Sequence, residues 1–320
     1  MGCTKAASQS RRSSVTIVFQ ISLKFSCLAL AWLGLCAFGP WRPAGAGGAS
    51  LGMADAQVAA GAGAGALYGN PAGMSQVQHG VIEAGFARAG QAASGAPFVS
   101  YVDSTSAWGL AAGVGYAKEM GWTATAPVRD GHDLRLGLSV GGQSDAGKLL
   151  LGGTARYLSA NRGGEAAVSG WTGDIGAIVG MQVFRIGAVL RNVSQLDARV
   201  APRRVGLAIG FIGQQLVGEA GASLGAGNGE SLPADSATGP SYRAGLTFQF
   251  GQEGLQLRTG YQFDQIVTNL PTRHWVCGGL AWRTPKMGFD LSMAVDAVGN
   301  HSTMITGSLT FLVPYDAESP

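Results

Sequence analysis

The chain has 320 residues, of which 52 are glycine and only 13% are charged, about half the usual charged share of a soluble domain. The glycines follow no Gly-X-Y repeat, which excludes a collagen helix. A hydrophobic share of 46% is too high for a simple disordered chain. Strands with small residues on one face and apolar residues on the other would produce this composition.

The first 46 residues have the pattern of a secretory signal. Three basic residues near the start (Lys5, Arg11 and Arg12) precede the apolar run Phe25–Phe38. This run is shorter than the roughly 20 apolar residues that span a bilayer. Gln20 and Lys24 interrupt any longer apolar stretch, which argues against the alternative of a retained membrane anchor. The small residues at 44–46 predict cleavage before Gly47, so we expect residues 1–46 to be a signal peptide.

Removing this presequence changes both the charge and the cysteine count. It holds five of the 22 basic residues and no acidic ones, so the remaining chain has 17 basic against 19 acidic residues, a net charge of −2. Nucleic-acid binding thereby loses its electrostatic basis. The presequence also holds Cys3, Cys27 and Cys36, which leaves Cys277 alone and excludes an intrachain disulfide or a thiol-based metal cluster.

Residues 47–77 are almost all Gly, Ala and other small residues. Ala54–Ala66 has no bulky apolar stripe that a helix could pack against a core. Asn70-Pro71 predicts a turn that ends the segment. We expect a packed N-terminal plug, or hatch, inside the structure that the following strands build, with Tyr68, Asn70, Pro71 and Gly73 as its site residues. A disordered glycine-rich linker is the alternative.

From Gln78 to Val313 we count about fourteen strand candidates, most of them near the roughly 9–11 residues of a tilted membrane-spanning strand. In Asp133–Gly142, for example, leucine and valine alternate with small and polar residues. A soluble sandwich also alternates. Aromatic residues near the ends of the apolar faces, and the scarcity of Lys and Glu on those faces, favour a membrane barrel whose apolar side faces lipid.

The connections between these strands alternate in length. Longer ones (such as 119–132, 193–203 and 225–240) alternate with shorter ones (such as 143–147, 180–182 and 212–214), as the external loops and periplasmic turns of outer-membrane barrels do. We therefore predict an all-β fold, a closed antiparallel transmembrane β-barrel of about 14 strands over residues 78–313. An even strand number places both ends in the periplasm, so residues 314–320 would be a periplasmic tail.

A family resemblance supports this interpretation. Gly52–Ala56 (GMADA), Ala66–Tyr68 and Asn70–Met74 (NPAGM) resemble the start of mature FadL/PorV-like outer-membrane β-barrels. In that family a small-residue segment that ends in Asn-Pro-Ala-Gly folds into the barrel lumen. This chain departs from the pattern at Gly69, where the family usually has an aromatic residue. Residues 171–176 (WTGDIG) and 307–311 (GSLTF) resemble later strands of the family.

The sequence holds no pattern that indicates an enzyme. The four histidines have no metal-ligand spacing, and neither a Gly-x-Ser-x-Gly elbow nor a Walker-type motif is present. We expect no catalytic, cofactor or metal site. We expect the strand charges to face the lumen, where they pair across it and hold the plug; a role in selectivity is the alternative. These charges are Arg135, Arg156, Asp174, Arg191, Arg243, Arg258, Arg283, Asp290 and Asp296.

Two functions remain open at this point. The resemblance implies either a FadL-like channel for hydrophobic or amphipathic small molecules, gated by the plug, or a PorV-like barrel that acts as a scaffold in protein secretion or surface attachment. Both place the protein in the outer membrane of a Gram-negative bacterium. Expected partners are outer-membrane lipid, the outer-membrane assembly machinery, and hydrophobic small molecules or secreted proteins, but not nucleic acid.

Overall fold

The computed structural model describes residues 47–89, 95–106, 109–119, 128–144, 147–162, 167–194, 196, 201, 203–225, 240–251, 254–264, 272–298 and 303–313. The predicted signal peptide (1–46) and tail (314–320) lie outside these residues. In the described part of the chain, no helix is both long and apolar enough to cross a membrane.

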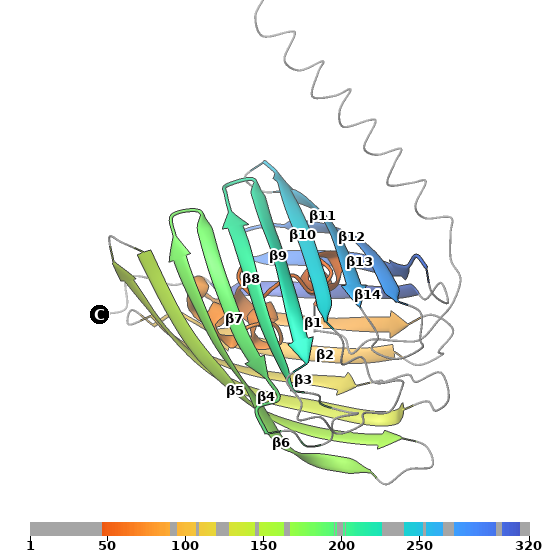
Figure 1. Ribbon diagram of the computed structural model, residues 1–320. Helices are drawn as coiled ribbons and strands as arrows, with labels where there is room; N and C mark the ends of the chain where they lie inside the picture. The colour runs from red at the N-terminus through yellow and green to blue at the C-terminus, as the bar shows by residue number, and fades with distance from the viewer. Residues whose placement is uncertain are drawn as a thin grey trace, which may run out of the picture. The chain divides into compact units, whose positions relative to one another are not determined.

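Fourteen antiparallel strands form a closed barrel, which confirms the predicted fold class (Figure 1). Each strand pairs with its neighbours in the sequence, and β1 pairs with β14 from Gly80↔Val313 onward to close the ring. The strands are β1 Gly80–Ala89, β2 Gly95–Asp103, β3 Leu110–Glu119, β4 Val128–Ser144, β5 Gly147–Arg162, β6 Val168–Met181, β7 Phe184–Arg191, β8 Arg204–Ile212, β9 Leu216–Gly225, β10 Ser241–Phe250, β11 Leu255–Asp264, β12 Arg273–Arg283, β13 Met287–Asp296 and β14 Thr303–Val313.

Three strands are longer than the sequence pattern predicts. β4, β5 and β6 have 17, 16 and 14 residues. β4 begins at Val128, inside the predicted connection 119–132, because its first residues continue to pair with the end of β5 across a register shift between Val128 and Asp130. Residues 128–132 (VRDGH) show no apolar alternation, so the expected boundary at this end was wrong.

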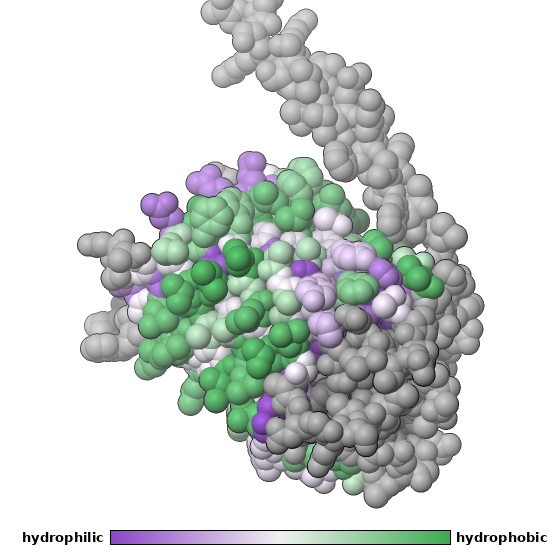
Figure 2. All heavy atoms as spheres, viewed as in Figure 1, coloured by the Kyte–Doolittle hydropathy of each residue, from purple (hydrophilic) through white to green (hydrophobic). Residues whose placement is uncertain are grey.

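The apolar faces point outward, as predicted. In β4, Leu134, Leu136 and Leu138 are exposed at 36%, 49% and 70%, whereas the alternate residues Asp133 and Arg135 are buried. Phe248 and Leu291 are also exposed, and Leu257 is half-buried. Hydrophobic side chains accordingly cover much of the visible wall (Figure 2). Inward placement of the charges avoids the roughly 2–4 kcal/mol that a basic side chain costs at the midplane of the lipid face.

Aromatic pairs mark both ends of this outer surface. At the long-connection end, the Tyr116 hydroxyl lies 2.8 Å from Nδ1 of His132, and the Tyr261 hydroxyl lies 2.6 Å from Nδ1 of His274. At the short-turn end, the rings of Phe184 and Phe211 pack edge to face with centroids 5.8 Å apart. Tyrosine and histidine rings, which have polar tips, suit the boundary between lipid and water at the long-connection end.

Residues 47–76 lie against the inner face of the barrel (Figure 1). They form three short helical turns, α2 (Gly48–Gly52), η2 (Gly63–Leu67) and η3 (Pro71–Gln76). α2 contacts β11–β14, η2 contacts β1–β3, and η3 contacts β3–β6. The segment therefore touches strands that lie on different sides of the ring.

Glycines in the wall make room for this segment. A Cβ at Gly115 would lie 2.7 Å from a methyl group of Leu67, and one at Gly137 would lie 2.6 Å from the other. A Cβ at Gly260 would lie 2.5 Å from the carbonyl carbon of Met53. Real Cβ contacts are never this short, so the inner wall and the segment fit only because these wall positions lack side chains.

This fit predicts the effect of enlarging the wall. Gly260→Val should lower the free energy of unfolding by about 1–3 kcal/mol, the usual range for an overpacked site, because it collides with the backbone of Met53 and Ala54. Urea unfolding from lipid vesicles measures this change. The control Gly278→Val faces open space, since its nearest neighbour is 3.9 Å away. Equal stability of the two variants would contradict the tight fit at Gly260.

Candidate functional site

Asn70 joins the inner segment to two strands of the wall. Its side chain is fully buried, and its Nδ2 donates to the carbonyl oxygens of Val58 (2.6 Å), Ala188 (3.2 Å) and Ala177 (3.3 Å). Its Oδ1 accepts from the Ala72 amide at 3.2 Å and so caps η3, which Pro71 begins. The predicted Asn-Pro turn is thus also a cross-link between the segment, β6 and β7.

The other predicted residues of the segment, Tyr68, Pro71 and Gly73, are close to Asn70 in the chain but have different contacts. Tyr68 is buried, and the Arg135 guanidinium lies 4.7 Å from the centre of its ring, a cation–π contact. Burial raises the pKa of the Tyr68 hydroxyl above its usual value of 10.0, so this group stays protonated. Gly73 packs against Gly61, where a Cβ would overlap the Gly61 carbonyl oxygen. All four predicted residues of the segment are buried. Among the hydrogen bonds that the structure describes, the side chain of Asn70 is the only one of the four that bonds to the wall.

Three of the predicted lumen charges meet around Asp133. Its Oδ2 lies 2.8 Å from Nη2 of both Arg135 and Arg156. Arg135 also reaches Asp174 at 3.5 Å, and Arg156 donates to Asn192 Oδ1 at 3.1 Å. Arg135 further donates to the Leu67 carbonyl oxygen at 3.4 Å, which ties the network to the segment. The sequence analysis missed Asp133, although it lies two residues before Arg135 and therefore on the same face of β4.

A second group of predicted charges lies under α2. Arg258 and Asp290 form a buried ion pair, and Arg283 Nη2 lies 3.6 Å from the other oxygen of Asp290. Gly48 packs on Asp290 so closely that a Cβ there would be 2.7 Å from the Cβ of Asp290. The wall therefore meets the start of the segment with a compact group of two guanidinium groups that share one carboxylate.

The remaining predicted charges make contacts elsewhere along the inner face. Arg191 donates from Nη2 to the Gly69 carbonyl oxygen at 3.0 Å. Arg243 donates to the Ser241 hydroxyl at 3.4 Å, and Asp296 Oδ1 accepts from the backbone amides of His274 and Val298 at 3.4 Å. Arg191 thus hydrogen-bonds to the segment as Arg135 does, whereas Arg243 and Asp296 contact the wall.

Two buried glutamates that the sequence analysis missed also contact the segment. Glu219 of β9 accepts from the amides of Val58 (2.7 Å), Ala59 (2.8 Å) and Ala60 (2.7 Å), so one carboxylate satisfies three consecutive backbone donors. Glu83 of β1 accepts from the Ser308 hydroxyl at 2.9 Å, and that hydroxyl oxygen accepts from the Gly48 amide at 3.4 Å. Their inward-facing positions on the strands were the one sign in the sequence that they face the lumen. Their hydrogen-bond partners are more than 150 residues away in the chain, so no local pattern indicates these partners.

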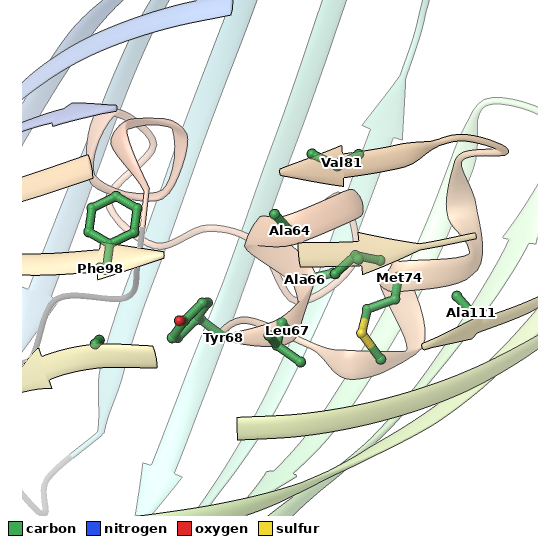
Figure 3. Packing of buried hydrophobic residues seen from close by; sticks show 10 residues of the cluster. Ala64, Ala66, Leu67, Tyr68, Met74, Val81, Phe98 and Ala111 are labelled. Atoms are coloured by element: carbon green, nitrogen blue, oxygen red, sulfur yellow. The ribbon is translucent and has the colours of Figure 1, made fainter. Parts of the chain in front are cut away.

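Among the residues that the structure describes, apolar side chains fill the space between segment and wall in four buried clusters. In the first, Leu67, Tyr68 and Met74 pack with wall residues that include Val81 and Phe98 (Figure 3). A second cluster joins Leu51 and Ala54 to Trp275, Cys277, Ala294 and Met304. Beside it, Trp275 Nε1 and Gln262 Oε1 are buried without a hydrogen-bond partner in the described structure. Apolar patches thus lie among the charged groups where the segment meets the wall, and two unsatisfied polar atoms lie beside one of these patches. Across the described residues, no group of three or more His, Cys, Asp and Glu is placed to hold a metal.

The Glu219 contact predicts a measurable change in the segment. A hydrogen bond to a charged group contributes about 1.5–3 kcal/mol, so Glu219→Gln should speed amide exchange at residues 58–60 by roughly tenfold or more. Hydrogen exchange of the folded barrel followed by mass spectrometry measures this. Gln214→Ala, at an exposed position in the same hairpin, is the control. Unchanged exchange in Glu219→Gln would show that this carboxylate does not hold the segment.

Comparison with known proteins places the fold. No protein-family model matches the sequence, and no curated protein matches it. Among solved structures, the toluene transporter TodX of P. putida aligns with a TM-score of 0.58 at 12% identity over 84% of this chain and 97% of TodX. A ΔS2 mutant of the TodX monoaromatic hydrocarbon channel aligns with a TM-score of 0.57 at 13% identity over 84% of this chain and 98% of the mutant. The chain thus shares the barrel fold of TodX, in line with the resemblance of its Asn70–Met74 motif to FadL/PorV-like barrels.

Proposed function

We propose that the protein is an outer-membrane channel for hydrophobic or amphipathic small molecules, with residues 47–77 as its gate. The observation that carries the proposal is the way in which this segment contacts the wall. Its three helical turns contact β11–β14, β1–β3 and β3–β6, yet no residue of the described segment pairs with a strand as part of the sheet. A segment held by side-chain contacts can move without breaking the hydrogen bonds of the barrel.

The lining of the lumen supports the class of solute. The two apolar clusters around Leu67 and Leu51 lie where segment and wall meet, so a gate that opens there would expose apolar surface on both sides. Trp275 Nε1 and Gln262 Oε1 offer one donor and one acceptor beside that surface. An apolar or amphipathic molecule with at most a few polar atoms fits such a lining, and the hydrocarbon channel with the same fold transports toluene.

Polar contacts hold the proposed gate closed. Glu219 and Asn70 together hold residues 58–60, because the first accepts from their amides and the second donates to the Val58 carbonyl oxygen. Loss of these bonds would free the middle of the segment while α2 stays on β11–β14. Opening would therefore begin beside β6–β9.

Deletion of residues 47–74 tests the gate. The deletion leaves the strand pairing and the lipid-facing side chains intact, so the truncated barrel should still insert. Its ion conductance in planar bilayers and its toluene flux into vesicles should both exceed those of the intact protein. The double variant Glu219→Gln/Asn70→Ala keeps the whole segment and should show an intermediate increase.

The control for this experiment is a test that each variant folds. Heat-modifiable electrophoretic mobility reports whether each variant forms a barrel before flux is compared. If the folded truncated barrel conducts no more than the intact one, the segment is not a gate. A PorV-like scaffold for secreted proteins then becomes the better hypothesis.

A further inference from the structure

Two basic side chains lie side by side on the inner face at the short-turn end of the barrel. Lys148 is the second residue of β5, and Arg185 is the second residue of β7. Both face inward, because their neighbours Leu149 and Phe184 are exposed on the outer face at 51% and 58%. Gly180 of β6 lies between them in the sheet, paired with Lys148 on one side and with Arg185 on the other.

These two cations differ from the lumen cations of the two charge networks. Arg135, Arg156 and Arg258 each form an ion pair with an aspartate. In contrast, neither Lys148 nor Arg185 has an ion pair or a hydrogen bond to any residue that the structure describes, and Nη1 of Arg185 is buried without a partner. A buried donor on a charged group without a partner is unfavourable, and like charges nearby add repulsion.

The position between the two cations is open. A Cβ at Gly180 would meet Arg185 Cγ at 3.6 Å, Lys148 Cβ at 3.7 Å and Arg185 Nε at 3.9 Å, all ordinary contact distances. The backbones of β5 and β7 are about 10 Å apart by the usual strand spacing, within reach of two long side chains that share one ligand. The next inward residues on β5 and β6 are Leu150 and Ile178, which form an apolar cluster with Ala72.

We propose that Lys148 and Arg185 form an oxyanion-binding site over Gly180, which takes the carboxylate or phosphate group of an amphipathic molecule. The guanidinium offers paired donors that match the two oxygens of such a group, and the ammonium adds a second positive charge. The apolar part of the ligand lies toward Leu150 and Ile178. The site does not depend on the proposed channel function, because binding at one end of the lumen requires no passage through it.

Substitution at Gly180, which lies between the two cations, tests the site. Gly180→Asp places a carboxylate between the two cations and should occupy the site, whereas Gly180→Asn adds the same bulk without charge. The full-length protein in dodecyl maltoside at low salt is titrated calorimetrically with octanoate, octyl phosphate and octanol. Gly180→Asp should weaken octanoate binding at least tenfold, and Gly180→Asn should change it less than threefold. Octanol binding should be the same in all variants.

A second pair of variants removes the cations. Lys148→Gln/Arg185→Gln should also weaken octanoate binding at least tenfold, whereas Arg88→Gln, at an exposed position near the opposite end, should leave it unchanged. Heat-modifiable mobility confirms folding, and the two Gly180 variants keep the test valid if the double variant does not fold. A response of octyl phosphate alone supports the site and assigns it to lipid phosphate. Unweakened binding of both anions to Gly180→Asp, or equal losses in Gly180→Asp and Gly180→Asn, overturns the proposal.

Discussion

The structure depends on how a segment with few bulky side chains is held inside a closed ring. Residues 47–76 cannot anchor themselves by apolar burial alone, so their backbone groups need partners from the wall. The Glu219 carboxylate provides the largest single share, with three consecutive amide donors at 2.7–2.8 Å. Arg135 and Arg191 satisfy carbonyl oxygens at Leu67 and Gly69. The inward-facing carboxylates and guanidinium groups thus serve as hydrogen-bond partners for the backbone amides and carbonyl oxygens of the segment.

The same arrangement accounts for the composition of the chain. A wall that approaches a backbone this closely needs glycine at the contact positions, and a segment that must fit needs glycine and alanine on its own side. Glycine weakens an isolated strand. In a closed barrel the cost is offset, because every strand has two neighbours and no edge is left unpaired.

Much of the fold could be read from the sequence because alternation is a local signal. Leu134, Leu136 and Leu138 indicate an outward face with no knowledge of the neighbouring strands. The start of β4 could not be read in this way, since residues 128–132 lack alternation and are held in the sheet by pairing with β5. The association of Asp133 with Arg135 and Arg156 depends on strand register, which the sequence does not display. Glu219 was missed because its partners are backbone amides, which leave no mark in a sequence.

The long-range nature of the Glu219 contact also has a consequence for assembly. Val58 and Glu219 are 161 positions apart in the chain, and Gly48 and Ser308 are 260 apart. The segment is synthesised before every strand that holds it, and its partners on β9 and β14 come together only as the sheet closes. Such distant contacts form slowly. Gly48 and Val58 therefore reach these partners only after β14 and β9, respectively, have been made.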